Sequence, residues 1–117
     1  MKRDMDLARR ILFEIEKQSF DESETALKFD GFTDEEVSYH IMLLDEAGLI
    51  TAHDLSGGSD LFWIPKRLTW QGYEFLDAAR DDTRWNKAKE AMAGAGGFVF
   101  EVAKALLIDF MKKQLMP

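Results

Sequence analysis

The chain has no cysteine among its 117 residues, which excludes disulfide bonds, a thiol nucleophile and a cysteine-ligated metal. The first 17 residues have no uninterrupted apolar run and contain Asp4, Asp6, Glu14 and Glu16, which is unlike a signal peptide. The longest apolar stretch, residues 98–111, is interrupted by charged residues and is therefore not expected to span a membrane. A hydrophobic content of 46% excludes a disordered chain and is enough for one core. We therefore expect a folded cytoplasmic protein that makes no contact with a membrane.

Basic residues are missing from a large part of the chain, since no lysine or arginine occurs between Lys28 and Lys66. The window 29–65 carries a formal charge of −8, whereas the whole chain carries −7. Its eight carboxylates are Asp30, Asp34, Glu35, Glu36, Asp45, Glu46, Asp54 and Asp60. Protein affinity for nucleic acid comes largely from lysine and arginine side chains that neutralise phosphates. A surface built from this window is therefore disfavoured for DNA binding.

Residues that usually build catalytic and cofactor sites are also scarce. The only histidines are His40, which we expect to be a hydrogen-bonded residue in or beside the core, and His53, which we expect on the surface. Neither has partners at the spacing of metal ligands. The Gly94–Gly97 stretch lacks the lysine and the preceding strand of a phosphate-binding loop. We therefore expect no enzymatic activity, no cofactor and no metal.

The N-terminal residues have the pattern of an amphipathic helix that begins at Asp4, its N-cap, and ends at Lys17. Its predicted buried stripe consists of Ala8, Ile11, Leu12 and Ile15. For the following residues, 19–32, two interpretations stay open. A second helix of two turns fits Ser23–Phe29, and the alternative is a short extended segment at Leu27–Phe29.

A helix and a β-hairpin are predicted next. Thr33 has the features of an N-cap, with Glu36 completing a capping box, and Gly48 ends the helix as a left-handed residue. The buried stripe of this helix is predicted to be Val37, Ile41 and Leu44. Two strands, Leu49–Leu55 and Leu61–Ile64, are expected around the flexible tip Ser56–Ser59, with Pro65 closing the second strand because it lacks a backbone donor.

Three helices are predicted in the C-terminal third of the chain. The first is Trp70–Arg80, in which Gly72 is expected to allow close packing against a neighbouring backbone. The second begins at Asp82 or Thr83 and should bury Trp85, Ala88 and Met92. The third is Phe98–Leu115, whose apolar arc is wider than one core contact requires.

The order of these elements predicts a mostly α-helical protein with a small β-hairpin, an α+β fold of the winged-helix type. The segment VSYHIMLLDEAGLI, Val37–Ile50, is typical of a recognition helix followed by the first strand of a wing. We expect residues 1–80 to form the winged-helix domain. Residues 81–117 would form a helical extension, packed on it within a single structural domain or placed at a dimer interface.

Several segments together resemble a family of small bacterial and prophage-encoded proteins that is grouped as a domain of unknown function. They are KRDMDLARRIL, YHIMLLDEAGLI and RLTWQGYEFLDAARDDTRWNK. The resemblance implies a cytoplasmic, winged-helix-like protein with a C-terminal helical extension, and it implies no catalytic residues. The phrase LLDEAGLI followed by LTWQG is also similar to bacterial transcription regulators of the winged-helix class, which is the link to DNA.

The outward face of the helix that begins at Thr33 is the first candidate site. It would enter the major groove in the usual docking of a winged helix on DNA, but it offers no arginine, lysine, asparagine or glutamine for base recognition. It is either a solvated face or a protein-docking face with two apolar anchors ringed by acidic residues. The candidate docking residues are Glu35, Ser38, Tyr39, Met42 and Glu46.

A basic face on the first helix is the second candidate site, for phosphate or for an acidic partner. Its residues, with two from the base of the wing, are Lys2, Arg3, Arg9, Arg10, Phe13, Lys17, Lys66 and Arg67. The alternative, which we favour, is that these charges offset the acidic window within the same protein.

The wide apolar arc of the last helix is the third candidate site and favours a homodimer over a monomer. The candidate dimer face consists of Val99, Ala103, Leu106, Leu107, Phe110 and Met111. The alternative is packing of this arc on Phe13 and Trp85 of the same chain. Taken together, the sequence predicts a non-enzymatic winged-helix protein that binds an unidentified protein partner. The alternative is a small dimeric transcription regulator that contacts DNA through its basic face.

Overall fold

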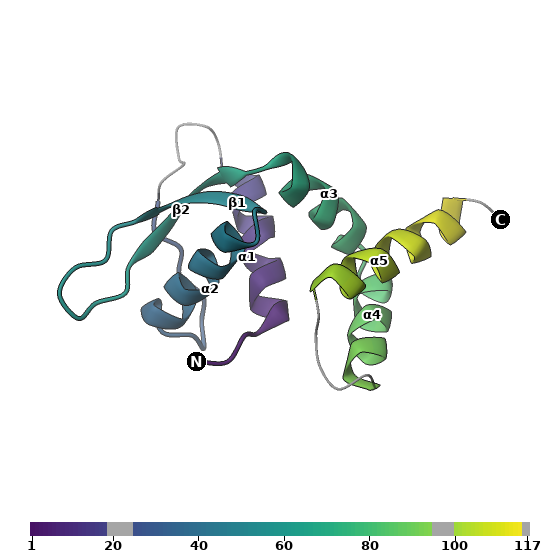
Figure 1. The fold of residues 1–117 in the computed structure, drawn as a ribbon, viewed down its shortest axis with the longest axis horizontal. Helices are drawn as coiled ribbons and strands as arrows, with labels where there is room; N and C mark the ends of the chain where they lie inside the picture. Colours follow the sequence, from purple (N-terminus) through teal and green to yellow (C-terminus); the bar gives the residue numbers. More distant parts are fainter. Residues whose placement is uncertain (19–24, 95–99, 116–117) are drawn as a thin grey trace. The chain divides into compact units, whose positions relative to one another are not determined.

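The computed structural model describes residues 1–18, 25–94 and 100–115, which form helices and one small antiparallel sheet (Figure 1). The elements in chain order are α1 (Met5–Lys17), α2 (Asp34–Glu46), β1 (Ile50–Asp54), β2 (Trp63–Leu68), α3 (Trp70–Ala79), α4 (Asp82–Gly94) and α5 (Phe100–Leu115). The predicted α+β class, mostly helical with a small hairpin, is confirmed. The chain divides into two compact units, Met1–Tyr73 and Glu74–Pro117, with the boundary inside α3. The predicted division after residue 80 lies just beyond the end of this helix.

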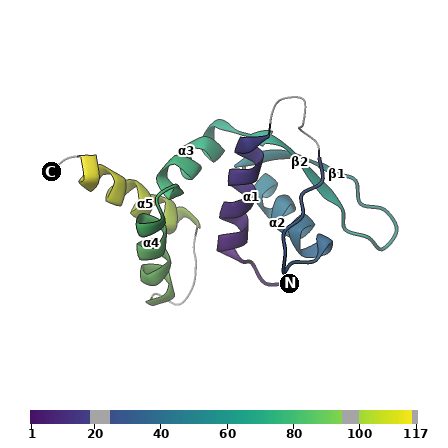
Figure 2. The same ribbon diagram turned by 180° about the vertical axis from the view of Figure 1, so that it is seen from behind.

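The first helix of the first unit is the predicted one. The Asp4 side chain accepts a hydrogen bond from the backbone N–H of Leu7 at 3.0 Å and caps the helix. The predicted stripe is buried, and Ile11 and Leu12 are completely so. In both ribbon views α1 and α2 lie side by side, and both contact the hairpin (Figures 1 and 2). The core of this unit lies between these two helices and the sheet.

The segment between α1 and α2 contains no second helix in its described part. Residues 25–29 are neither helix nor strand, and Ser23, where the predicted helix would begin, lies outside the described residues. The segment is held by the burial of Phe29 and by a turn at Gly31, whose φ is 87°. Two isolated helical turns have little stability of their own.

Helix α2 begins and ends as predicted. The Thr33 hydroxyl accepts from the backbone N–H of Glu36 at 3.1 Å, and the Glu36 carboxylate accepts from the N–H of Thr33 at 2.9 Å, which completes the capping box. The backbone and hydroxyl hydrogen bonds of Thr33, together with the nearby His40, hold the pKa of Glu36 below its usual value. Gly48 follows the helix with a φ of 78°, a left-handed conformation that glycine adopts without strain.

The second strand is longer than predicted, and the expectation that Pro65 ends it is wrong. Strand β2 continues through Pro65 to Leu68. Ala52 pairs with Pro65 while Thr51 pairs with Arg67, so Lys66 is the extra residue of a β-bulge. A sheet of two strands leaves one edge of each strand unpaired, and proline is tolerated at such edges and at bulges because no ladder donor is needed there.

The base of the hairpin is attached to the start of α3. The Thr69 hydroxyl donates to the carbonyl oxygen of Gly48 at 2.6 Å and accepts from the N–H of Gly72 at 3.0 Å. The N–H of Thr69 donates to the Leu49 carbonyl oxygen at 2.9 Å. A Cβ atom at Gly72 would overlap that same Leu49 oxygen. The predicted reason for this glycine, close packing against a neighbouring backbone, is confirmed.

The second unit is built on aromatic packing among α3, α4 and α5. Residues Trp85, Ala88 and Met92 are buried as predicted. The Phe75 ring lies edge-on to Trp85, with 6.3 Å between ring centroids, and 5.0 Å from the ring of Phe100. Arg84 donates to the carbonyl oxygens of Asp77 and Ala78, each at 3.1 Å, and to the side chain of Gln114. One arginine thus caps the end of α3 and holds the end of α5.

Candidate protein-binding groove

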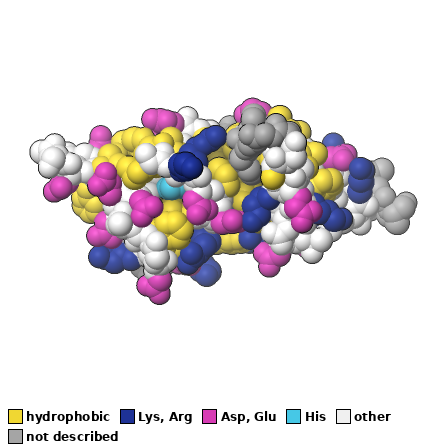
Figure 3. Space-filling model, turned by 90° about the horizontal axis from the view of Figure 1, so that it is seen from below, with side chains coloured by type: hydrophobic (Ala, Val, Ile, Leu, Met, Phe, Trp, Pro, Cys, Tyr) yellow, Lys and Arg dark blue, Asp and Glu magenta, His cyan; other side chains and the backbone are white. Residues whose placement is uncertain are grey.

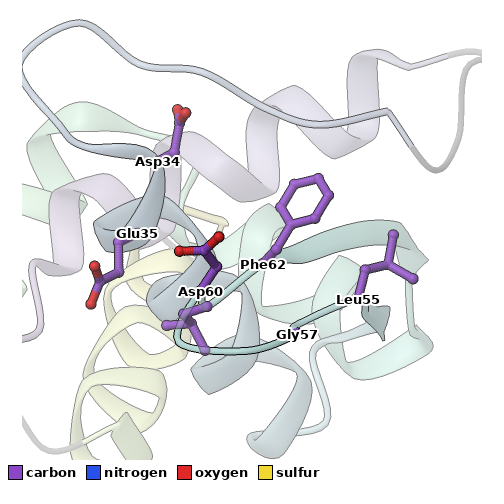
Figure 4. A pocket seen from close by; sticks show the side chains of 7 residues that line it. Asp34, Glu35, Leu55, Gly57, Asp60 and Phe62 are labelled. Atoms are coloured by element: carbon purple, nitrogen blue, oxygen red, sulfur yellow. The ribbon is translucent and has the colours of Figure 1, made fainter.

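A hollow of about 530 Å³ lies in the first unit between the first turn of α2 and the end of the hairpin (Figure 4). Helix α2 contributes Asp34 and Glu35, and the hairpin contributes Leu55, Gly57, Asp60, Leu61 and Phe62. In Figure 4 the carboxylate of Asp60 points from the hairpin toward the side on which Asp34 and Glu35 lie. We name this hollow the acidic groove. It combines three carboxylates with three apolar side chains.

Two apolar side chains of the acidic groove are exposed to solvent, and hydrogen bonds of the hairpin fix the backbone that carries them. The N–H of Leu55 donates to the carbonyl oxygen of Phe62 at 2.8 Å, and the N–H of Phe62 donates to the hydroxyl of Ser56 at 2.9 Å. The pairing of the two strands thus continues beyond β1 and β2. Leu55 remains 53% exposed and Phe62 40% exposed. An exposed apolar pair at the rim of a hollow is a common feature of binding surfaces.

Backbone hydrogen bonds within the tip of the hairpin, and hydrogen bonds between Ser56 and the Asp54 carboxylate, fix the conformation of the tip. Gly57 and Asp60 form two reciprocal backbone hydrogen bonds, at 3.3 and 3.0 Å, around a two-residue turn in which Gly58 has a φ of 59°. Hydrogen bonding from Ser56, through its hydroxyl and its backbone N–H, holds the pKa of Asp54 below its usual value. The carboxylate of Asp60 therefore extends from a defined turn.

A second, smaller hollow of about 220 Å³ adjoins the acidic groove and shares Asp34 and Phe62 with it. Its other lining residues are Ala26, Leu27, Lys28, Val37, Ser38 and Trp63. Lys28 lies 3.7 Å from Asp34 and forms an exposed ion pair with it. Within the described part of the chain, Glu35 and Asp60 have no such ion-pair partner. Two of the three carboxylates are therefore not matched by a basic side chain of the described residues.

Four of the five predicted docking residues lie where the sequence places them, and Ser38 does not. Glu35 and Glu46 are exposed, and Tyr39 and Met42 are half-buried. Ser38 is buried, and its hydroxyl accepts the backbone N–H of Trp63 at 3.0 Å, which ties β2 to α2. Its place on the helix is next to the buried stripe, so a hairpin packed on that side covers it. Ser38 is therefore a structural residue and is removed from the docking face.

His40 has the satisfied core environment that was predicted. It is buried, and its Nε2 atom lies 2.7 Å from the backbone nitrogen of Asp4, whose N–H it accepts. Its Nδ1 atom lies 2.7 Å from the carbonyl oxygen of Glu36, to which it donates. Both ring nitrogens of His40 are therefore hydrogen-bonded. His40 thus links the start of α1 to α2.

The basic face of α1 is largely engaged with aromatic side chains of the same unit. The Arg9 guanidinium lies 5.0 Å from the centroid of the Phe13 ring, and that of Arg10 lies 5.0 Å from the centroid of Phe29. Lys17 pairs with Glu14 at 3.3 Å. Phe13 is therefore covered by an arginine. Arg10 joins α1 to the segment before α2.

The remaining basic residues are spread over different elements. Lys2 and Arg3 are exposed before α1, Lys66 is half-buried in the bulge, and Arg67 lies 3.5 Å from the carbonyl oxygen of Leu68. Figure 3 shows one face of the molecule, on which lysine and arginine side chains are intermingled with aspartate and glutamate. The basic residues on this face do not gather in one patch.

The predicted dimer face is only partly available. Ala103 and Leu107 are completely buried. They are therefore interior residues and not residues that a second copy can contact. Leu106, Phe110 and Met111 are half-buried. Val99 lies outside the described residues.

The hairpin half of the acidic groove is absent from the sites predicted from the sequence. The predicted elements place Leu55 at the end of the first strand and Phe62 in the second strand, whereas Asp60 lies between the predicted tip and that strand and belongs to neither. The signal was present in SGGSD, since a turn with Leu55 before it and Phe62 after it places two apolar side chains opposite each other.

Among residues 1–18, 25–94 and 100–115 no cluster of acidic or histidine side chains could hold a metal ion. No helix in these ranges is long and apolar enough to cross a membrane.

The architecture defines a small, mostly helical α+β protein that carries a hairpin with an acidic groove. The chain belongs to the family described as "Hypothetical protein (DUF2513)", whose model matches residues 2–98 and thus ends before α5. It is similar to an "Uncharacterized protein" of Haemophilus influenzae strain Rd, with 50% identity over 92 residues that cover 76% of each chain. No solved structure matches the chain.

Proposed function

We propose that this protein is a non-enzymatic winged-helix module that binds another protein through the outward face of α2 and the adjoining hairpin. In this assignment α2 is the recognition helix, and β1 and β2 form the wing. The origin in a prophage or mobile element belongs to the same proposal and rests on the sequence resemblance alone.

The observation that carries the proposal is the charge of the surface that a winged helix would present to DNA. Glu35 and Glu46 are exposed on α2, and Asp60 is exposed on the hairpin. Like charges brought together across an interface cost several kcal/mol, roughly, so these carboxylates oppose the approach of phosphates. Tyr39 and Met42 lie between the two glutamates and keep part of their surface exposed. Such half-exposed anchors among charged residues are typical of protein interfaces.

The alternative function is a small dimeric transcription regulator that contacts DNA through the basic face. One observation favours it: Lys2, Arg3, Arg10 and Arg67 are exposed. Against it, the arginines of α1 are stacked on aromatic rings of the same unit, and a positive charge that covers a ring is less free to reorient toward a phosphate.

Site-specific photo-crosslinking in living cells tests the proposal. Tyr39 is replaced by the photoreactive residue p-benzoylphenylalanine, which keeps an aromatic ring at this position. The matched control carries the same residue at Asn86, an exposed position of α4. We expect a discrete protein adduct from position 39 and none from position 86. Adducts with DNA from position 39, or identical adducts from both positions, would contradict the proposal.

Binding to DNA gives the complementary measurement. We expect the purified protein to bind a random duplex no tighter than about 1 μM at physiological salt, the weak regime of ordinary non-specific binding. If it binds more tightly, the variant Arg9→Glu/Arg10→Glu identifies the surface. A complete loss in this variant would establish the alternative function.

A further inference from the structure

We infer that the acidic groove accepts an extended segment of a partner protein in which basic and apolar side chains alternate. The inference rests on the proposed function and adds the chemical class of the partner. It starts from two features that meet in the same hollow of about 530 Å³, exposed carboxylates and exposed apolar side chains.

The carboxylates determine the charge of the ligand. Glu35 and Asp60 line the groove, are exposed and have no ion-pair partner within the described residues. Asp34 already has Lys28 beside it, at 3.7 Å. A lysine from another chain could form the same kind of exposed ion pair with Glu35 or Asp60. A segment with lysine or arginine side chains would therefore be complementary in charge, and an acidic or phosphorylated segment would be repelled.

The apolar side chains determine the second property of the ligand. Leu55 and Phe62 stand opposite each other on the hairpin, linked by the backbone hydrogen bond of 2.8 Å. The smaller hollow of about 220 Å³ continues beyond Phe62 and is lined by Val37 and Trp63. This volume is sufficient for an apolar side chain to leave water, which is favourable in proportion to the area that it buries.

An extended conformation satisfies both properties at once. Successive side chains of an extended peptide point to opposite sides. Figure 4 shows the acidic residues Asp34 and Glu35 on the helix side of the groove, and Leu55 and Phe62 on the hairpin side. A segment with alternating side chains can therefore direct its basic residues toward the carboxylates of Glu35 and Asp60 and its apolar residues toward Leu55 and Phe62.

Fluorescence anisotropy with a synthetic probe tests the inference on the full chain. The probe is the fluorescein-labelled peptide Gly-Arg-Leu-Arg-Leu-Arg-Gly. One control peptide has glutamate in place of arginine, and a second has serine in place of leucine. At low salt we expect a Kd between about 10 and 100 μM for the probe, which is ordinary for a short peptide. We expect at least tenfold weaker binding, roughly, for both control peptides.

Protein variants locate the site. The variant Glu35→Gln/Asp60→Asn should weaken binding of the probe about tenfold, and Phe62→Ser should weaken it about fivefold. The matched control is Glu90→Gln, which removes one exposed carboxylate from α4, outside the groove and outside the proposed docking face, and should change the Kd less than about twofold. All these side chains are exposed, so unchanged thermal unfolding curves should verify that the variants fold.

The outcomes separate this inference from the proposed function. If the probe fails to bind, or Glu90→Gln weakens binding as much as the groove variants do, the inference is wrong. A protein adduct at position 39 would then still support the interaction module. If position 39 instead crosslinks to DNA and the probe does not bind, both are wrong.

Discussion

The residues that flank the two ends of the hairpin differ in how they are held, although the same two strands lie between them. At the base, Thr69 and Gly72 bind the backbone of Gly48 and Leu49 with no space for an added atom. At the tip, Leu55 and Phe62 are paired through their backbones but leave their side chains in solvent. The same element therefore serves stability at one end and presents a surface at the other. Paired substitutions, one at the base and one at the tip, can test this difference.

The largest effect is expected from Gly72→Ala at the base. The added methyl group would overlap the Leu49 carbonyl oxygen, a backbone atom that cannot move without the hairpin. We expect a loss of at least about 3 kcal/mol of unfolding free energy, at the upper end of overpacking effects. The control Gly57→Ala, near the tip, has nothing within 4 Å of its new methyl group and should stay within about 0.5 kcal/mol of the parent protein. Urea unfolding followed by circular dichroism measures both, and equal losses would contradict the comparison.

The next effect concerns apolar side chains. Ile64 is buried in β2, whereas Phe62 is 40% exposed two residues earlier. Ile64→Ala should cost about 2 to 3 kcal/mol, because it removes buried methyl groups and leaves a cavity. Phe62→Ala should cost less than about 1 kcal/mol, since much of its ring is already in water. Thermal unfolding of the two variants measures the difference. A larger cost at Phe62 would mean that the tip belongs to the core.

A smaller effect is expected from two serines that accept neighbouring backbone donors. The buried Ser38 hydroxyl accepts from Trp63 at 3.0 Å, and the exposed Ser56 hydroxyl accepts from Phe62 at 2.9 Å. Ser38→Ala should cost about 1 to 2 kcal/mol, because the part-buried N–H of Trp63 loses its partner. Ser56→Ala should cost roughly 0.5 kcal/mol or less, because water replaces the hydroxyl at an exposed site. Amide hydrogen exchange of the backbone N–H groups of Trp63 and Phe62 measures each site separately. Equal exchange rates of these two groups in the two variants would contradict the expected difference between Ser38 and Ser56.

The smallest effect is a pH dependence confined to the tip. Hydrogen bonds from Ser56 lower the pKa of Asp54 below its usual value of 3.8. A carboxyl group whose pKa is lowered by folding stabilises the folded state above its unfolded pKa, and this contribution is lost as the pH falls through the folded pKa. The tip should therefore be fully ordered above about pH 4 and loosen below it. The amide chemical shift of Ser56 should report this titration, which should disappear in Asp54→Asn. Glu36 also has a lowered pKa in its capping box, so the Ser56 signal is needed to separate the two groups.

Much of the fold could be predicted because its signals are local. The Asp4 cap, the Thr33 and Glu36 capping box and the left-handed Gly48 all depend on contacts within a few residues, and each is present in the structure. The periodic stripes of α1 and α2 are buried for the same reason, since a helix turns its apolar face toward whatever core exists. The continuation of β2 through Pro65 could not be read locally. It depends on the sheet having only two strands and on a bulge opposite Thr51 and Ala52.

The candidate site was predicted less completely, because exposure depends on packing between distant residues. The spacing of residues along α2 predicts Ser38 on the outward face, but the hairpin, twenty-five positions further along the chain, covers it. Arg10 looked like a free charge, but its guanidinium lies over the ring of Phe29. Neither contact leaves a signature in the spacing of residues along one helix.

The sequence alone shows that residues 29–65 carry eight carboxylates and no basic residue, and it predicts a capped helix and a hairpin within them. Composition and local hydrogen bonding suffice for both conclusions. The tertiary structure is needed to show which charged side chains face solvent and which apolar side chains lie beside them. The acidic groove exists because the hairpin folds back over the first turn of α2 and brings Asp60 and Phe62 near Glu35. Residues so far apart in sequence are brought together by packing, which no local pattern encodes.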